Sequence, residues 1–209
     1  MDKVILIRHA ESESNVGGVF EHQHTVKITS KGKTQAKDLS EVLDMPDRII
    51  CSRFIRTIET AEPLMHKFPN AETHIWIETH EFQPLDTRRY AGATTEVRDE
   101  IAREYWSRMD PLFHDGGNSE SFKDLVDRVN VSILKMNNLH GINYIFTHAN
   151  FIRCLLVLLN DYPDFNKQQN KDYLYLQIMQ KFEESYLSGN LPIKNTEIFD
   201  VSELLGKYS

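Results

Sequence analysis

Residues 3–12 read KVILIRHAES, and this stretch decides the fold. Residues 4–7 (VILI) form a continuous apolar run rich in β-branched side chains, which predicts a strand buried on both faces. Arg8 and His9 follow directly, at the carboxyl end of that strand. Because ligands of open α/β sheets bind just outside the carboxyl ends of the strands, we expect a functional site here.

Outward from this stretch, predicted strands and helices alternate along the chain. Short apolar runs predict further strands at residues 48–51, 74–77 and 144–147, and a weak one at 196–199. Apolar positions at helical spacing predict helices from Thr29 or Ser30 to about 44, at 54–68, from Thr94 or Thr95 to about 109, and at 119–139, 151–159 and 174–186. Residues 78–93 show little periodicity and are predicted as a long loop. The pattern indicates one α/β domain over residues 1–209, with a mainly parallel central sheet and helices on both faces.

Composition narrows the classes of partner. The chain has 24 basic and 31 acidic residues, a formal net charge of −7. This balance argues against nucleic acid or an anionic membrane as partner, because both need a basic face. No stretch has the length of a signal-peptide core or a membrane span, so we expect a cytoplasmic protein. Cys51 and Cys154 lie in apolar stretches and are expected to be buried free thiols.

Two histidines stand at equivalent places in the predicted sheet. His9 follows the strand at 4–7, and His148 follows the strand at 144–147. A helix begins at about Ala149, so its first amides and positive dipole end point at the same space. A single histidine at a strand end is usually structural. Two of them beside a helix N-terminus instead favour an anion site.

Two arginines strengthen this interpretation. Arg8 precedes His9, and Arg56 lies on the first turn of the helix after the strand at 48–51. Guanidinium groups fit phosphate oxygens bidentately and stay charged when partly buried. The sequence therefore predicts a site for a small phosphorylated substrate.

Four stretches, in this order, resemble motifs of the histidine phosphatase superfamily, which includes the phosphoglycerate mutases. Residues 8–12 (RHAES) resemble its Arg-His-Gly-Glu-Ser motif, and 28–36 (ITSKGKTQA) resemble its Leu-Thr-x-x-Gly-x-x-Gln-Ala helix start. Residues 52–61 (SRFIRTIETA) are similar to its Ser-x-Leu-x-Arg-Ala-x-Gln-Thr-Ala stretch, and 147–149 (THA) to its second-histidine motif. One such motif is weak; an ordered set is specific.

The resemblance implies a mechanism in which His9 attacks phosphorus and becomes phosphorylated. It implies that four side chains, with the helix amide at Ala149, hold the phosphoryl oxygens: Arg8, Asn15, Arg56 and His148, the last as a cation. No metal ion and no cofactor are expected.

The resemblance also implies a carboxylic acid in the loop after the third strand, which would protonate the leaving oxygen. That loop contains Glu78 and Glu81, and residues 79–82 (THEF) best resemble the family's position, so we choose Glu81.

We therefore expect a phosphomonoester hydrolase of the histidine acid phosphatase type. Two alternatives stay open: mutase-type transfer within the same family, and a non-catalytic phosphate-binding or adaptor domain. A pure binder needs no nucleophile. The basic residues with which mutases hold a triose phosphate find no clear match, and Arg88 and Arg89 are expected to face solvent. The physiological substrate and the oligomeric state are not predicted.

Overall fold

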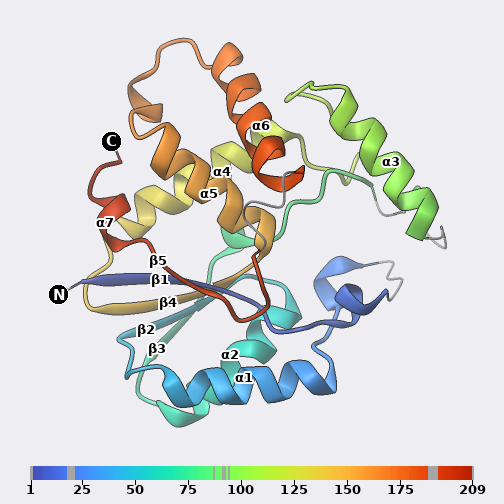
Figure 1. Cartoon of the computed structure of the whole chain (residues 1–209). Helices are drawn as coiled ribbons and strands as arrows, with labels where there is room; N and C mark the ends of the chain where they lie inside the picture. Colours follow the sequence, from blue (N-terminus) through green and yellow to red (C-terminus); the bar gives the residue numbers. More distant parts are fainter. Residues whose placement is uncertain are drawn as a thin grey trace.

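The computed structural model describes residues 2–17, 22–86, 88–90, 93, 95–187 and 193–208. Across these residues the strands form one sheet in the order β3-β2-β4-β1-β5 (Figure 1). Four strands are mutually parallel, namely β1 (Lys3–Arg8), β2 (Arg48–Cys51), β3 (Glu72–Ile75) and β4 (Ile142–Thr147). Strand β5 (Ile198–Asp200) pairs antiparallel with β1 at one edge. The predicted, mainly parallel α/β sheet is confirmed.

Helices cover both faces of the sheet, as predicted (Figure 1). One face carries α1 (Ser30–Val42) and α2 (Ile55–Lys67). The other carries α4 (Phe122–Met136) and α5 (Ala149–Asp161), with α6 (Asp172–Leu187) packed on them. Helix α3 (Thr95–Ser107) lies farther from the sheet, and the short α7 (Ser202–Leu205) lies beside β1. Single 3-10 turns lie at Glu13–Val16 (η1), Gln23–Thr25 (η2), Ile77–Thr79 (η3) and Phe165–Lys167 (η4).

The apolar run of β1 is explained by its two covered faces. Successive side chains of a strand point to opposite sides. Val4 and Leu6 therefore join the core with α4 and α5, whereas Ile5 and Ile7 join the core beneath α1 and α2. All four are buried.

Local side-chain bonds set where two helices begin. Thr29 accepts a hydrogen bond from the Gly32 amide at 3.0 Å and so caps α1, as predicted. Ser121 caps α4 in a reciprocal box with Asp124, so this helix begins at Phe122 rather than at the predicted residue 119.

The edge strand β3 differs from its prediction at 74–77. It spans Glu72–Ile75, and Ile77 belongs to η3. All four of its side chains are exposed, so an apolar alternation could not mark its ends.

Strand register brings the carboxyl ends of the parallel strands together. Arg8 is paired with Thr147, and Cys51 with both Phe146 and Ile75. The residues that follow these strands therefore share one edge of the sheet. Cys51 and Cys154 are buried and free, as predicted, and they lie in the cores on opposite faces of the sheet. Within the described ranges, no helix has the length and apolar character needed to cross a membrane.

Candidate active site

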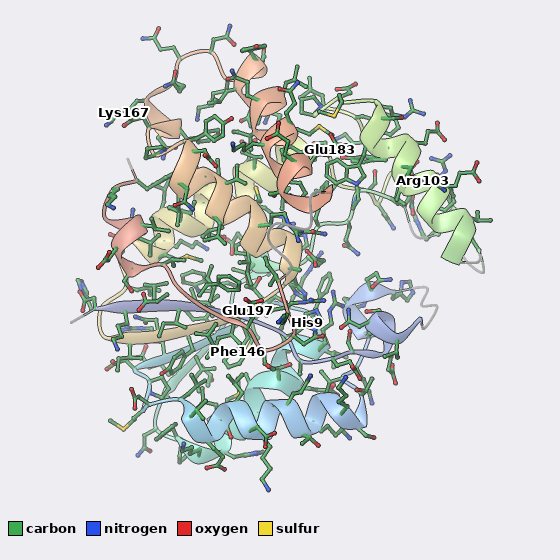
Figure 2. All side chains as sticks on the ribbon, viewed as in Figure 1. His9, Arg103, Phe146, Lys167, Glu183 and Glu197 are labelled. Carbon is green, nitrogen blue, oxygen red and sulfur yellow. The ribbon has the colours of Figure 1, made fainter. Side chains whose placement is uncertain are left out.

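His9 lies just beyond β1, at the carboxyl edge of the sheet (Figure 2). Its ring is almost fully buried. Nδ1 lies 2.7 Å from the carbonyl oxygen of Ala10, and Nε2 accepts a hydrogen bond of 3.2 Å from Nε of Arg56. A carbonyl can only accept, so Nδ1 carries the proton and Nε2 holds a lone pair. Burial, with the nearby Arg56 guanidinium, lowers the pKa of His9 well below its usual value.

His148 follows β4 and occupies the position just before α5, and its ring centroid lies 5.2 Å from that of His9. The predicted neighbourhood of the two imidazoles is therefore present. Nε2 of His148 lies 2.8 Å from Oγ of Ser52. Its Nδ1 is buried and has no hydrogen-bond partner among the described residues.

The surroundings of His148 in the protein alone oppose its predicted positive charge. Burial first, and then the Arg56 guanidinium, lower the pKa of this fully buried imidazole well below its usual value. A phosphate dianion beside the ring would oppose this shift and favour its protonation.

Arg56 lies on the first turn of α2, as predicted, and is buried. Its Nη1 donates to the backbone carbonyl of Gln23 at 2.7 Å. Burial lowers the pKa of Arg56 to about 10, although the Glu81 carboxylate opposes this shift. The guanidinium therefore stays charged at neutral pH.

Arg8 ends β1 and is partly buried. One of its guanidinium nitrogens, Nη1, donates to the carbonyl of Ile193. Burial lowers the pKa of Arg8, and the carboxylates of Glu81 and Glu197 oppose this shift. Residues near the C-terminus pass the end of β1, where the Arg8 amide donates to the Glu197 carbonyl at 3.2 Å.

The structure separates the two candidate acids. Oε1 of Glu81 accepts hydrogen bonds from the amide of Phe82 at 2.9 Å and from that of Asn150 at 3.1 Å. Glu78 instead pairs with Lys135 at 2.6 Å. The charge of Glu81 thus acts on Arg8 and Arg56, whereas the half-buried Glu78 is held in an ion pair with Lys135.

The N-terminus of α5 contacts a carboxylate of the protein itself, that of Glu81. Ala149 is the first helical residue, where the sequence predicts phosphate-binding amides. The next amide, that of Asn150, donates to the Glu81 carboxylate. The positive end of the helix therefore positions the candidate acid, beside any role it has toward phosphate.

Asn15 lies in η1 at the exposed border of the site. Its side-chain oxygen accepts from the amide and hydroxyl of Ser12, both at 3.0 Å, and from Nδ2 of Asn195 at 3.3 Å. These donors fix the oxygen, so the amide nitrogen is the end that a phosphate oxygen would meet.

Two residues of the site, Ser52 and Asn195, are not among those that the sequence predicts. Ser52 follows β2 and contacts His148, and the strand-end rule that selected the histidines could have selected it too. Asn195 donates to the backbone carbonyl of His9 at 2.9 Å, and no pattern in its polar segment indicates this.

Arg88 and Arg89 lie outside the site, as expected. Arg88 and Arg89 have half-exposed side chains paired with Asp86 and Asp115, at 3.0 and 2.9 Å. Among the residues that the structure describes, no cluster of three or more His, Cys, Asp or Glu side chains is arranged to hold a metal ion.

The site thus consists of a buried pair of histidines at the carboxyl edge of a parallel α/β sheet, with two arginines and a carboxylate beside them. The family model of the histidine phosphatase superfamily (branch 1) matches residues 4–173. The chain belongs to this superfamily, as its motifs predict.

Individual relatives are more distant. Over 138 residues the chain is 30% identical to the adenosylcobalamin/alpha-ribazole phosphatase of Salmonella typhimurium, covering 63% of this chain and 65% of that protein. Over 109 residues it is 28% identical to phosphoglycerate mutase 1 of Saccharomyces cerevisiae, covering 50% and 42%. The chain thus spans less than two thirds of the length of these curated relatives.

Solved structures share the fold. A phosphoserine phosphatase from Entamoeba histolytica, in complex with 3-phosphoglyceric acid, superposes with a TM-score of 0.64 at 18% identity, covering 95% of this chain and 89% of that one. A putative alpha-ribazole-5'-P phosphatase from Escherichia coli gives a TM-score of 0.61 at 23% identity, covering 76% and 79%.

Proposed function

We propose that this protein hydrolyses small phosphomonoesters through a phosphohistidine formed on His9, with no metal ion. One observation carries the proposal: Nε2 of His9 has its lone pair directed at the Arg56 guanidinium, 3.2 Å from Nε. A phosphoryl oxygen that takes over this hydrogen bond places phosphorus next to the nucleophile. Membership of the superfamily supports the same chemistry.

In the first half-reaction, Nε2 of His9 attacks phosphorus and forms an N–P bond while the bond from phosphorus to the ester oxygen breaks. Arg8 and Arg56 bind the phosphoryl oxygens, on which charge collects in the transition state. Glu81, protonated at this stage, gives its proton to the leaving oxygen, so an alcohol departs and the carboxylate remains.

In the second half-reaction, water attacks the phosphohistidine. The Glu81 carboxylate takes a proton from that water, the N–P bond breaks, and inorganic phosphate leaves. His9 returns to its neutral form. The buried environment that lowers the His9 pKa favours this neutral state at both ends of the cycle.

Trapping the intermediate tests the proposal. Wild-type protein mixed briefly with a ³²P-labelled phosphomonoester and quenched in alkali should carry acid-labile, base-stable phosphate on His9. His9→Ala should lose both label and turnover. Label on serine or cysteine would contradict the mechanism. Binding of phosphate without any label would favour a non-catalytic binding domain instead.

Metal independence is tested separately. The fixed cations Arg8 and Arg56 occupy the role that divalent ions have in other phosphatases. Full activity should survive dialysis against EDTA, and vanadate, which mimics five-coordinate phosphorus, should inhibit strongly. Activity lost to EDTA and restored by magnesium or zinc would contradict this part of the proposal.

A further inference from the structure

A cavity of about 190 Å³ lies beside the proposed reacting groups. Its lining includes Arg56, which contacts Nε2 of His9, and Glu81, the proposed acid. A phosphoryl group bound by Arg56 and aligned with His9 would therefore direct its leaving group toward this cavity. The other described lining residues are Gln23, Phe54, Phe82, Gln83, Pro84 and Leu85.

The walls of this leaving-group cavity are mainly apolar. Four of the six side chains just named are hydrocarbon, and the remaining two are uncharged amides. Among the described lining residues, Arg56 is the one cation. The phosphoryl group of the substrate would already pair with it. A second phosphate or a carboxylate on the substrate would be desolvated there without a counter-charge, which is costly.

Two aromatic walls are fixed by their surroundings. Phe54 is buried, with its ring centroid 4.8 Å from Cζ of Arg56 and 5.1 Å from the ring centroid of His148. Phe82 is buried against Phe122 and Tyr105, at ring-centroid distances of 6.0 and 6.2 Å. Rigid walls reduce the ordering cost when a ligand binds.

The volume limits what fits. An apolar cavity of roughly 150 Å³ in another protein binds benzene, whereas sites for drug-sized ligands measure roughly 300–1,000 Å³. At about 190 Å³, this cavity accommodates one ring with a small substituent.

We propose that this cavity binds the leaving group, and that the substrates are small phosphate monoesters whose leaving group is apolar and ring-sized, such as aryl or arylalkyl phosphates. This substrate class rests on the proposed hydrolase function. It separates the protein from a mutase acting on an acidic triose phosphate.

Two substrates that share chemistry but differ in polarity test the class. Benzyl phosphate and glycerol 2-phosphate both release an alkoxide that Glu81 would protonate. We expect kcat/KM for benzyl phosphate to be higher by about 10-fold or more, the scale of discrimination in apolar pockets. A ratio of one or below would overturn the proposal.

A charged residue in the cavity should weaken the preference for the apolar leaving group. Leu85 is partly exposed, so Leu85→Lys should fold; we expect it to lower the benzyl-to-glycerol ratio about 10-fold. It should also raise kcat/KM for 3-phosphoglycerate. Leu134→Lys, at an exposed site on α4, is the matched control and should keep the wild-type ratio. An unchanged ratio in Leu85→Lys would place the leaving group elsewhere.

Phosphoramidate separates this proposal from the proposed function, because its leaving group is ammonia and does not fill the cavity. Label on His9 from phosphoramidate, together with a substrate ratio of one or below, would overturn the substrate class alone. No label from phosphoramidate or from either ester would overturn the hydrolase function and the substrate class together.

Discussion

His9 can act as a nucleophile only in the tautomer that leaves Nε2 unprotonated. The Ala10 carbonyl accepts from Nδ1, and the Arg56 guanidinium, which has no acceptor, donates to Nε2. Both contacts select the same tautomer. Arg56 thus selects the tautomer of the nucleophile, and its guanidinium can also bind a phosphate oxygen.

Glu81→Gln tests the proposed acid at the residue scale. General acids contribute about 10²–10⁴-fold, so turnover of an alkyl phosphate should fall by about that factor. Loss on p-nitrophenyl phosphate should be far smaller, because its phenolate leaves without a proton. The phosphoenzyme should accumulate there, since water is no longer activated. Steady-state and quenched-flow kinetics measure both effects.

Glu78→Gln is the matched control, because Glu78 pairs with Lys135 and not with the site. It should be close to wild type on both substrates. If the two variants exchanged behaviours, the acid would be Glu78. If neither showed a loss that depends on the leaving group, the acid would lie elsewhere.

Some site residues are predictable from the sequence and others are not, and the difference has a physical reason. His9, His148 and Arg56 follow buried strands, whose apolar runs mark the carboxyl edge of the sheet. Glu81 lies in a loop without periodicity, and only the resemblance to a family motif selected it over Glu78. Asn195 reaches His9 across 186 positions of the chain, a contact that no local pattern records.

At the scale of elements, helix α4 holds the loop that carries the proposed acid. Nη1 of Arg128 donates to the carbonyls of Glu78 and His80, both at 2.8 Å. Its Nη2 donates to Glu120 at 2.9 Å, and the Glu120 amide donates to the carbonyl of Gln83 at 2.8 Å. Arg128 and Glu120 therefore hold the chain by hydrogen bonds on both sides of Glu81, and we expect them to position the acid.

Arg128→Met should therefore lower kcat for an alkyl phosphate about 10-fold or more, with little change in KM, and should affect p-nitrophenyl phosphate less. Leaving the mostly buried Glu120 carboxylate without its arginine should also reduce the free energy of unfolding by about 1–3 kcal/mol. Adding Glu120→Gln should restore part of that stability but not kcat, because the two carbonyls still lack their donor.

Arg128→Lys should recover more activity than Arg128→Met, since an ammonium can reach one of the carbonyls. Arg108→Met, which removes an exposed ion pair with Glu104, is the control and should change neither quantity much. Equal losses of kcat on both ester types in Arg128→Met would indicate a structural role without positioning of the acid.

The order of strands and helices is more predictable from the sequence than the residues at which they begin and end. Alternating strands and helices, with an apolar run long enough to be covered twice, specify a parallel α/β sheet. The exposed edge strand β3 and the capped start of α4 differ by two or three residues, because side-chain bonds and the edge position set those limits. The antiparallel pairing of β5 depends on a return of the chain that periodicity does not encode.

Across the whole molecule, the surroundings of three histidines, two of them fully buried, disfavour their protonation. Burial, with neighbouring arginines, lowers the pKa of His9 and of His148 well below the usual value. Burial, with Arg128, lowers the pKa of His80 to about 4. Protonation of these side chains is disfavoured in the folded chain. We therefore expect acid to lower the free energy of unfolding.

The direction in which the free energy of unfolding changes with pH follows from proton uptake by the unfolded chain. Above pH of about 6.5, these histidines are neutral in both the folded and the unfolded chain, so they add no pH dependence. Below it, the unfolded chain binds protons that the folded chain rejects. The free energy of unfolding should then fall with decreasing pH by up to about 1.4 kcal/mol per pH unit for each histidine. For His80 the fall should continue to a pH of about 4.

Urea unfolding at half-unit steps from pH 7 to pH 5 measures this dependence. His80→Gln removes one of the three groups without touching the proposed reacting atoms. It should make the curve shallower below pH 6.5 by up to about 1.4 kcal/mol per pH unit. His22→Gln, at an exposed position, should leave the slope as in wild type. A wild-type stability that stayed flat, or rose, between pH 6.5 and 5 would contradict burial of neutral histidines as the source of acid sensitivity.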